Sequence, residues 1–276
     1  MLIVNICVNY NNTPRVNRFI HDHMVRDEYF DHLYVVDNSN NFVLDEGLNF
    51  LRGKKLTILI PGDNLGYMGA CRHAYESCLV KIKKKHVVIL SNVDLNILTS
   101  SKNFKKNILE KVGVDIGVIS PLVLHQGSEI YYPAEQLTRT PVFKYMIKKV
   151  VFNFYPALLF YDTYTFVRHF IHRWFAIKKS SHKKIVSKKV YAPCGSFMIF
   201  TPEYRASGLN FNYPVFLFGE EVFVAESCLE NSLSVFFDTS IVIAHEGYDT
   251  TNIFSNKAML KYKREAINFQ GREYFK

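Results

Sequence analysis

The chain has 276 residues, of which 48% are hydrophobic, 15% aromatic and 21% charged. A chain of this length and composition can bury a sizeable core, which excludes an intrinsically disordered protein. The formal net charge is +9, but the segment from Arg139 to Lys189 holds 12 Lys or Arg and one acid, Asp162. That segment carries +11 and the remaining residues carry −2, so the basic character belongs to one segment only.

The cysteines and the N-terminal sequence bear on the compartment in which the protein works. The cysteine count is odd, there is no Cys-x-x-Cys pair, and a disulfide framework or zinc site is not expected. Residues 1–8 lack the basic start and the small-residue cleavage site of a signal peptide. The longest apolar run, Val150 to Tyr161, is too short to span a bilayer. We therefore expect a cytoplasmic protein.

Short apolar runs alternate with helix-like stretches over the first 125 residues. This alternation predicts an α/β fold in which helices cover both faces of a mostly parallel central sheet. The expected strands are Leu2–Asn9, Leu33–Val36, Leu56–Ile60, Val87–Leu90 and Gly117–Ser120. The expected helices are Pro14–Met24 with Thr13 as N-cap, Gly69–Lys83, and Thr99–Lys111 with Thr99 as N-cap.

The alternation stops between about residues 125 and 190, where Lys-Lys pairs and large aromatics interleave. We therefore expect a single domain, 1–276, made of an N-terminal half (1–124), a basic aromatic insertion (125–190) and a C-terminal half (191–276). Within the last part, the pattern predicts a strand at Ala192–Phe200, a helix at Glu220–Asn231, short strands at Val235–Phe237 and Ile241–Ala244, and a helix at Lys257–Phe269.

Polar residues follow the early strands, at the carboxyl ends where ligands bind in such sheets. Asn92 and Asp94 point the same way if strand geometry continues past Leu90, and their oxygens could hold Mg²⁺ or Mn²⁺ on a diphosphate. Asp37 could accept hydrogen bonds from a base edge or a ribose. A simple turn is the alternative for both places, because Asn and Asp are common turn formers.

Three other features could carry chemistry. The loop from Asp63 to Ala70 holds two glycines that let the backbone approach a ligand, although a plain loop-to-helix junction fits equally well. Glu220 and Glu221 open a helix, where the dipole stabilises acids, and one of them could serve as a general base. His245 follows a strand and could either ligate a metal or be structural.

In chain order these features resemble glycosyltransferase family 2. The order is a strand-end Asp37, Asn-x-Gly-aromatic-x-Gly, Asn-x-Asp, Gly-Ser-Phe-Met, Phe-x-Phe-Gly-Glu-Glu and His245, and it extends from about Leu2 to Thr251. The likeness is greatest to bacterial members that build surface polysaccharides, such as rhamnosyltransferase-like enzymes. It implies a GT-A fold, with a nucleotide-sugar-binding N-terminal half and an acceptor-binding C-terminal half.

The resemblance also implies the reaction and the site. An inverting glycosyltransferase would move a sugar from a UDP- or dTDP-sugar to a saccharide or lipid-linked saccharide with the help of Mg²⁺ or Mn²⁺. Asn92 stands where the family has the first acid of its metal motif, and Glu221 where many members carry an Asp proposed as the base. The matched positions are Tyr10, Asp37, Asn64, Gly66, Gly69 and Asn92 for the donor, Asp94 with His245 for the metal, Gly195 for the acceptor side, and Glu221 or Glu220 for catalysis.

The basic aromatic segment suits an anionic lipid surface, because Lys and Arg interleave with large aromatics in Phe143–Lys149, Phe166–Phe170 and Arg173–Phe175. A solvated basic helix pair is the alternative. No zinc finger, RNP motif or KH loop supports a nucleic-acid partner. We expect a protein peripheral to the inner face of the cell membrane; the sequence does not indicate an oligomeric state.

Two other functions compete with glycosyl transfer. A nucleotidyltransferase also uses a nucleotide-binding α/β sheet, but it needs a glycine- and basic-rich loop after the first strand, and residues 9–15 hold no glycine. The other is a non-catalytic nucleotide-sugar-binding module with a decayed site. Release of a nucleoside diphosphate in the presence of Mn²⁺ distinguishes the three functions.

Overall fold

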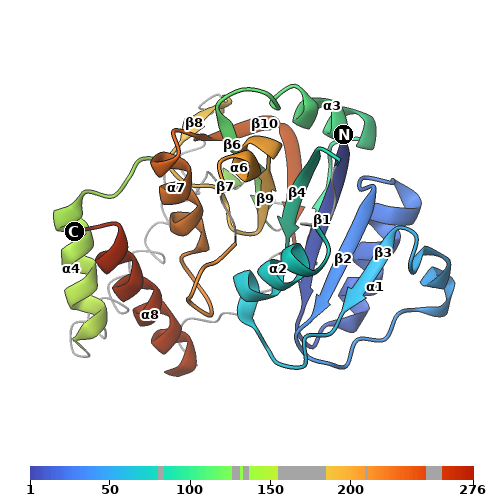
Figure 1. The fold of residues 1–276 in the computed structure, drawn as a ribbon, viewed down its shortest axis with the longest axis horizontal. Coiled ribbons are helices and arrows are strands. Elements are labelled where there is room, and N and C mark those ends of the chain that lie inside the picture. Colours follow the sequence, from blue (N-terminus) through green and yellow to red (C-terminus); the bar gives the residue numbers. More distant parts are fainter. Residues whose placement is uncertain (80–83, 126–130, 133–136, 155–184, 209–210, 247–256) are drawn as a thin grey trace, which may run out of the picture. The chain divides into compact units, whose positions relative to one another are not determined.

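A computed structural model describes residues 1–79, 84–125, 131–132, 137–154, 185–208, 211–246 and 257–276. The chain forms two compact units, one made of Met1–Arg139 with Ser187–Thr250 and the other of Thr140–Val186 with Thr251–Lys276. The first unit contains the sheet, and the described part of the second consists mainly of the helices α4 and α8 (Figure 1). The expected halves at 1–124 and 191–276 remain a prediction.

One mixed sheet runs through the first unit in the order β3-β2-β1-β4-β9-β6-β10-β5. The first four of these pair in parallel, as do β6 and β10, whereas β9 lies antiparallel between β4 and β6. This confirms the predicted α/β class. The strands are β1 (Leu2–Asn9), β2 (His32–Asp37), β3 (Leu56–Leu59), β4 (His86–Ser91), β5 (Leu95–Ile97), β6 (Ile116–His125), β7 (Tyr131–Tyr132), β8 (Lys188–Val190), β9 (Phe197–Phe200) and β10 (Ser234–His245).

Helices of the first unit cover the sheet and connect its strands, whereas α4 and α8 belong to the second unit. The apolar side chains of the covering helices, among them Phe19 of α1, Phe104 of α3 and Val224 of α7, are buried. The helices are α1 (Thr13–Ile20), continued by a π-helix (His21–Arg26), a 3₁₀-helix (Glu46–Leu51), α2 (Gly66–Ser77), α3 (Ser101–Leu109), α4 (Val142–Asn153), α6 (Pro202–Ala206), α7 (Glu220–Glu230) and α8 (Lys257–Glu273).

Several predicted boundaries were wrong for local reasons. Asn12, not Thr13, is the N-cap of α1, because the Val16 N–H already bonds to the Asn12 carbonyl at 3.2 Å. Ser100 precedes α3 in place of Thr99. Helix α2 begins at Gly66 rather than Gly69 and ends at Ser77.

Two predictions about strands also needed correction. Strand β9 begins only at Phe197, because residues 191–196 form bends and turns that bring Gly195 to the end of the sheet. The two short strands expected after residue 234 form one strand, β10, whose register against β6 shifts between Asp238 and Val242. A β-bulge of this kind bends a strand without ending it.

The second unit is held by contacts between α4 and α8. The Tyr145 ring stacks on Phe275 with 3.9 Å between centroids, and its hydroxyl donates to the Gln270 side chain at 2.6 Å. Arg264 donates to the Phe152 carbonyl at 3.0 Å. The rest of the predicted aromatic motifs, at 166–170 and 173–175, lie outside the described residues. No helix within the described ranges has the length and apolarity needed to cross a bilayer.

Candidate functional site

Buried polar side chains tie together the carboxyl ends of β1 and β2. Asn9 is in register with Asp37 and donates to its Oδ1 at 2.7 Å. The Ser39 hydroxyl donates to the same oxygen at 2.6 Å, and the Phe42 N–H donates to Oδ2 at 2.8 Å. Burial raises the pKa of Asp37, but these hydrogen bonds outweigh it and lower the pKa overall. Asp37 therefore stabilises the turn after β2, and its contact with a nucleotide remains a prediction.

The predicted glycine loop lies against another part of the protein. Asn38 donates to the Gly66 carbonyl at 2.9 Å, and the Asn64 side chain accepts from the Gly66 N–H at 3.0 Å. Gly66 has φ +72°, and a Cβ there would lie 2.1 Å from the Phe216 carbonyl oxygen. Glycine at position 66 thus allows the backbone to lie close to the loop that leads into α7.

Two more of the predicted donor residues flank this region. Tyr10 follows β1 with 61% of its surface exposed, so its ring is accessible to a ligand. Gly69 lies in the first turn of α2, where a Cβ would be 3.2 Å from the Cβ of Leu65. Helix packing is therefore sufficient to explain Gly69, and donor contacts by Tyr10, Asn64, Gly66 and Gly69 remain predictions.

Asp94 and His245 meet at the edge of the sheet although 151 positions separate them in sequence. Strand β5 runs antiparallel to β10 with Leu95 opposite His245, and this pairing places Asp94 beside the end of β10. Asp94 Oδ2 lies 3.1 Å from His245 Nε2. Burial raises the pKa of Asp94, but the hydrogen bond and charge of His245 outweigh it, so the pKa is lowered and the carboxyl is ionised at neutral pH.

Asn92 does not extend the strand toward Asp94. Strand β4 ends at Ser91, the Asn92 N–H donates to the Ser196 carbonyl at 2.9 Å, and residues 93–94 form a bend. The expectation that Asn92 and Asp94 point the same way along one strand was therefore wrong. Its premise failed because the chain must turn here to enter β5.

The Asp94–His245 pair fits a divalent cation of the expected kind. Mg²⁺ and Mn²⁺ take carboxylate oxygens, imidazole is a further ligand for Mn²⁺, and both ions keep positions for water or phosphate oxygens. The described part of the chain contains no group of three or more His, Cys, Asp or Glu side chains suited to a metal. The donor set thus fits an ion shared with a bound diphosphate better than an all-protein cage.

The predicted acceptor-side glycine and the predicted base are in contact. Glu220 and Glu221 occupy the first turn of α7, which follows Gly219 in a left-handed conformation at φ +85°. A Cβ on Gly195 would lie 2.2 Å from Glu221 Oε1, so the Gly195 backbone and the Glu221 carboxylate share one small space. Only glycine at position 195 allows the carboxylate to occupy that place.

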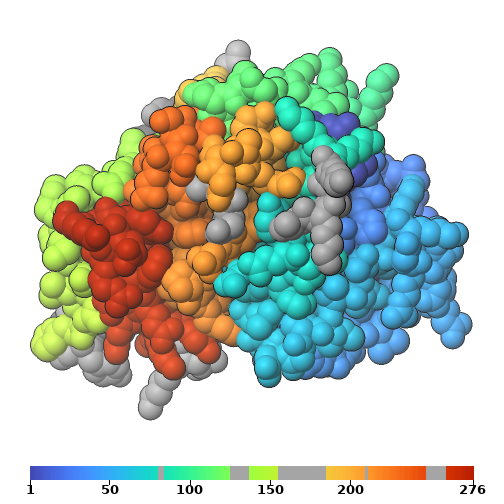
Figure 2. Space-filling view, in the orientation of Figure 1, coloured from blue at the N-terminus to red at the C-terminus, as the bar shows by residue number. Residues whose placement is uncertain are grey.

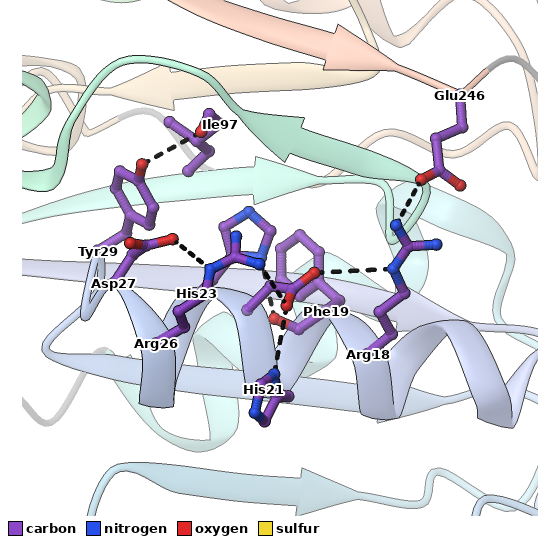
Figure 3. A network of polar contacts seen from close by, with 10 residues as sticks. Arg18, Phe19, His21, His23, Arg26, Asp27, Tyr29, Ile97 and Glu246 are labelled. Carbon is purple, nitrogen blue, oxygen red and sulfur yellow. Dashed lines mark hydrogen bonds and ion pairs between the residues drawn. The ribbon is translucent and has the colours of Figure 1, made fainter.

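The ion pair between Arg18 and Glu246, next to the end of β10, was not predicted from the sequence. Arg18 of α1 lies 3.2 Å from Glu246 and 3.7 Å from Asp22, and it connects α1 to the residue after His245 (Figure 3). The Glu246 N–H donates to the Asp94 carbonyl at 3.0 Å. The sequence did hold one signal for this ion pair. Arg15 and Arg18 are basic residues three apart on α1, and such positions share a helix face.

A buried ion pair on α7 was also missed. Arg139 donates to Glu226 Oε1 at 2.7 Å and to Oε2 at 3.1 Å, and the Tyr191 hydroxyl donates to the same carboxylate. Glu226 is only 5% exposed, so its charge needs these partners. Glu226 lies on α7 five residues after Glu221, so this cluster attaches α7 to the segments that contain Arg139 and Tyr191. It thereby fixes the helix that carries both glutamates.

Comparisons with known proteins identify the fold. No protein-family model matches the chain, and no curated protein matches its sequence. The crystal structure of GalNAc-T7 with UDP, GalNAc and Mn²⁺ is similar, with a TM-score of 0.54 at 13% identity over 90% of this chain and 44% of that chain. The mannosyltransferase PcManGT from Pyrobaculum calidifontis in complex with GDP-Man and Mn²⁺ is similar with a TM-score of 0.50 at 12% identity over 91% of this chain and 58% of that chain.

These similarities establish the architecture of the chain. The chain spans about half the length of the two solved proteins, and identities of 12–13% show the fold alone. Its curled mixed sheet with flanking helices is the fold of GT-A glycosyltransferases.

Proposed function

We propose that the chain is an inverting glycosyltransferase that moves a sugar from a nucleotide-diphosphate donor, a UDP- or dTDP-sugar, to a hydroxyl of a saccharide or lipid-linked saccharide. The observation that carries the proposal is the Asp94–His245 pair at 3.1 Å beyond the strand ends of a GT-A sheet. The structures of GalNAc-T7 with UDP and Mn²⁺ and of PcManGT with GDP-Man and Mn²⁺ support this class of donor and ion. From the sequence resemblance to glycosyltransferase family 2 we further propose that the reaction belongs to bacterial surface-polysaccharide synthesis, as O-antigen, capsule or lipopolysaccharide.

Asp94 and His245 would hold the Mg²⁺ or Mn²⁺ ion. When bound, such an ion neutralises the charge that develops on the leaving diphosphate. The low pKa of Asp94 keeps its carboxylate available at neutral pH. The pairing of β5 with β10 and the backbone bond from Glu246 to Asp94 hold the two ligands at one place.

Glu221 would act as the general base. The attacking acceptor oxygen forms a bond to the anomeric carbon while the bond from that carbon to the diphosphate oxygen breaks, and the hydroxyl proton passes to the Glu221 carboxylate. A single displacement of this kind inverts the anomeric centre. The contact with Gly195 supports Glu221 over Glu220, because it joins the base to the strand end predicted to face the acceptor.

Thermal unfolding with a panel of nucleotide sugars, with and without Mn²⁺, tests donor binding, because a ligand that binds the native state raises its stability. We expect a UDP- or dTDP-sugar to raise the unfolding midpoint only with the ion, and slow release of UDP or dTDP to follow. Asp94→Asn should abolish the ion-dependent part of both signals. Absence of any shift across the panel would contradict the proposal, and a shift without release would leave a nucleotide-sugar-binding module.

Replacement of the glutamates tests the base. Glu221→Gln should lower kcat by about 100-fold or more, as removal of a general base does, while the unfolding shift caused by the donor is retained. Glu220→Gln is the matched control, and we expect a smaller loss. Full turnover in Glu221→Gln would transfer the role to Glu220 or reject it for both residues.

We also propose that the protein associates peripherally with an anionic membrane, at the inner face of the cell membrane. On α4, Tyr145 and Phe152 point to one side and are buried. The opposite side carries an exposed apolar stripe, and Lys144 and Lys148 lie along its border. The stripe consists of Phe143, Ile147 and Val150, together with Phe154 after the helix, with exposed fractions between 58% and 64%.

A helix that is apolar on its outer face and basic along its flank suits the boundary between lipid headgroups and acyl chains. Flotation of the full chain with vesicles of phosphatidylcholine alone and with added phosphatidylglycerol tests this partner. We expect flotation with the anionic vesicles only, and its loss in Phe143→Asp with Ile147→Asp. Phe50→Asp, at a phenylalanine 57% exposed in the other unit, is the matched control and should still float. Failure of the unaltered protein to float with either vesicle contradicts the proposal.

A further inference from the structure

The hydroxyl of Tyr67 is one of four buried side-chain polar atoms without a hydrogen-bond partner among the described residues, and the proposed mechanism leaves it unexplained. Tyr67 lies in the first turn of α2. Its oxygen is shielded from solvent and has no hydrogen-bond partner within the described residues. A buried hydroxyl without a partner destabilises the folded state, so each one calls for an explanation.

The surroundings of Tyr67 point to the glutamates of α7. The neighbouring Gly66 touches the backbone of Phe216, and Arg72 on the same helix donates to the Asn212 side chain at 2.7 Å. Helix α2 therefore packs along the loop that ends at Glu220. In Figure 2 the turquoise surface of α2 lies beside the orange surface of this loop.

The ionisable groups facing Tyr67 come from three elements. Burial is the main cause of the raised pKa of Tyr67. Smaller contributions come, in decreasing order, from Cys71 of α2, Glu220 and Glu221 of α7, and Cys7 of β1. The phenol therefore stays protonated at physiological pH and can donate one hydrogen bond. A carboxylate on α7 is the strongest acceptor among these neighbours, because it carries a charge.

One of the two glutamates is in contact with the predicted acceptor side. The carboxylate of Glu221 lies against the Gly195 backbone. Burial is the main cause of the raised pKa values of Tyr67 and Cys71, and the charge of Glu220 adds to both. Successive helix positions point about 100° apart, so the two side chains point in different directions. Because Glu221 is the acid that lies against Gly195, we assign Glu220 as the acceptor for Tyr67.

Left-handed backbone directly precedes Glu220. Phe218 and Gly219 are both left-handed, with φ +71° and +85°. A non-glycine residue at such a φ stores strain, and strain of this kind concentrates at functional sites. This strained backbone lies directly beside the glutamate pair of α7.

We propose that Tyr67 is a positioning residue: when substrate binds, its hydroxyl donates a hydrogen bond to the Glu220 carboxylate, and this bond fixes the first turn of α7 so that Glu221 faces the acceptor hydroxyl. The inference rests on the proposed function and assigns the second acid of the pair, which the mechanism itself leaves idle. It also explains why an unpaired hydroxyl is retained in the free protein.

Tyr67→Phe tests the inference through opposite effects on stability and turnover. The unfolding midpoint of the free protein should stay the same or rise, because the substitution removes an unpaired buried hydroxyl. The kcat for sugar transfer should fall about tenfold or more with the KM for the donor unchanged, because the lost bond forms to a charged group. A residue with only a structural role does not combine these two results.

Tyr75→Phe is the matched control on the same helix. The Tyr75 hydroxyl accepts from Arg205 Nε at 2.8 Å, so its loss should lower the unfolding midpoint and leave kcat unchanged. Glu220→Gln and the Glu220→Gln/Tyr67→Phe double variant complete a mutant cycle. We expect the kcat of the double variant to equal that of the more impaired single variant.

The outcomes separate this inference from the proposed function. If the unaltered protein transfers no sugar from any donor, the proposed function fails and the inference falls with it. If the unaltered protein is active and Tyr67→Phe matches its kcat, only the inference fails. Loss of stability in Tyr67→Phe similar to that in Tyr75→Phe, or multiplicative effects in the double variant, would also overturn it.

Discussion

At the residue scale, the site depends on small side chains that leave room for charged ones. Gly195 leaves space for the Glu221 carboxylate, and a Cβ there would meet Oε1 at 2.2 Å and Cδ at 2.9 Å. The atoms that must move are the far end of a flexible side chain. The fold can therefore tolerate a larger residue at position 195, but the Glu221 carboxylate would then have to leave its present position.

Gly195→Ala should therefore impair turnover more than stability. We expect kcat to fall by about 100-fold, because a displacement of about 1 Å at a reacting group has that effect, with little change in the unfolding midpoint. Gly47→Ala is the control, since no atom lies within 4 Å of a Cβ at that position. Measurement of kcat and unfolding for both variants checks the prediction, and unchanged turnover in Gly195→Ala would place the base elsewhere.

At the element scale, the start of α2 is decided by a contact between two distant segments. Gly66 is left-handed, and its backbone lies against the Phe216 carbonyl, which is part of the loop before α7. The carbonyl belongs to the main chain and cannot rotate away as a side chain can. The position of α2, and with it that of Tyr67, therefore depends on this glycine.

Gly66→Ala should destabilise the protein more than Gly53→Ala. Both glycines are left-handed, at φ +72° and +75°, but a Cβ on Gly53 meets no atom within 4 Å. Gly53→Ala then measures the conformational cost alone, about 1–2 kcal/mol, and Gly66→Ala adds about 1–3 kcal/mol for the forced backbone shift. Urea unfolding of both variants gives the comparison, and equal losses would show that the loop yields freely.

At the scale of the whole molecule, two buried histidines and one partly buried histidine make stability depend on pH. His23 packs among the rings of Phe19, Tyr29 and Phe30, with its centroid 4.3 Å from that of Phe19. Burial lowers its pKa below the usual 6.5, against the opposing hydrogen bond to the Phe19 carbonyl. Burial also lowers the pKa values of His32 and His86.

The sign follows from which state binds more protons. Below about pH 6.5 these three histidines become protonated in the unfolded chain. In the folded chain they stay neutral down to a lower pH, so the free energy of unfolding falls as the pH falls. Each histidine contributes a slope of up to about 1.4 kcal/mol per pH unit between its folded pKa and 6.5. The lowered pKa values of Asp37 and Asp94 affect stability only below about pH 5, where the carboxylates of the unfolded chain begin to protonate.

His23→Phe should reduce this pH dependence. We expect the difference in unfolding free energy between pH 7.5 and pH 5.5 to decrease by the contribution of one histidine. This decrease does not depend on how the substitution changes stability at pH 7.5. Met24→Leu, a buried neighbour in the same π-helix, is the control and should leave the slope unchanged. Urea unfolding at the two pH values decides, and an unchanged slope in His23→Phe would contradict the role assigned to its burial.

The sequence alone determined the features that depend on near neighbours in the chain. Apolar runs such as Leu2–Asn9 and Val87–Leu90 predicted strands, because a strand buried on both faces requires them, and the polar residues after them predicted a ligand-binding edge. The helix starting at Glu220 was predicted correctly because two acids favour a helix N-terminus. These signals lie within a few residues of the element they specify.

Only the tertiary structure decided which of the candidate residues meet. Asp94 contacts His245 because β5 turns back to pair with β10, and Glu221 contacts Gly195 because β9 enters the sheet between β4 and β6. No local pattern encodes such pairings, since they depend on the path of the chain through the whole sheet. For the same reason Asn92 was misplaced and the buried hydroxyl of Tyr67 was not foreseen: burial and hydrogen bonding are set by segments distant in sequence.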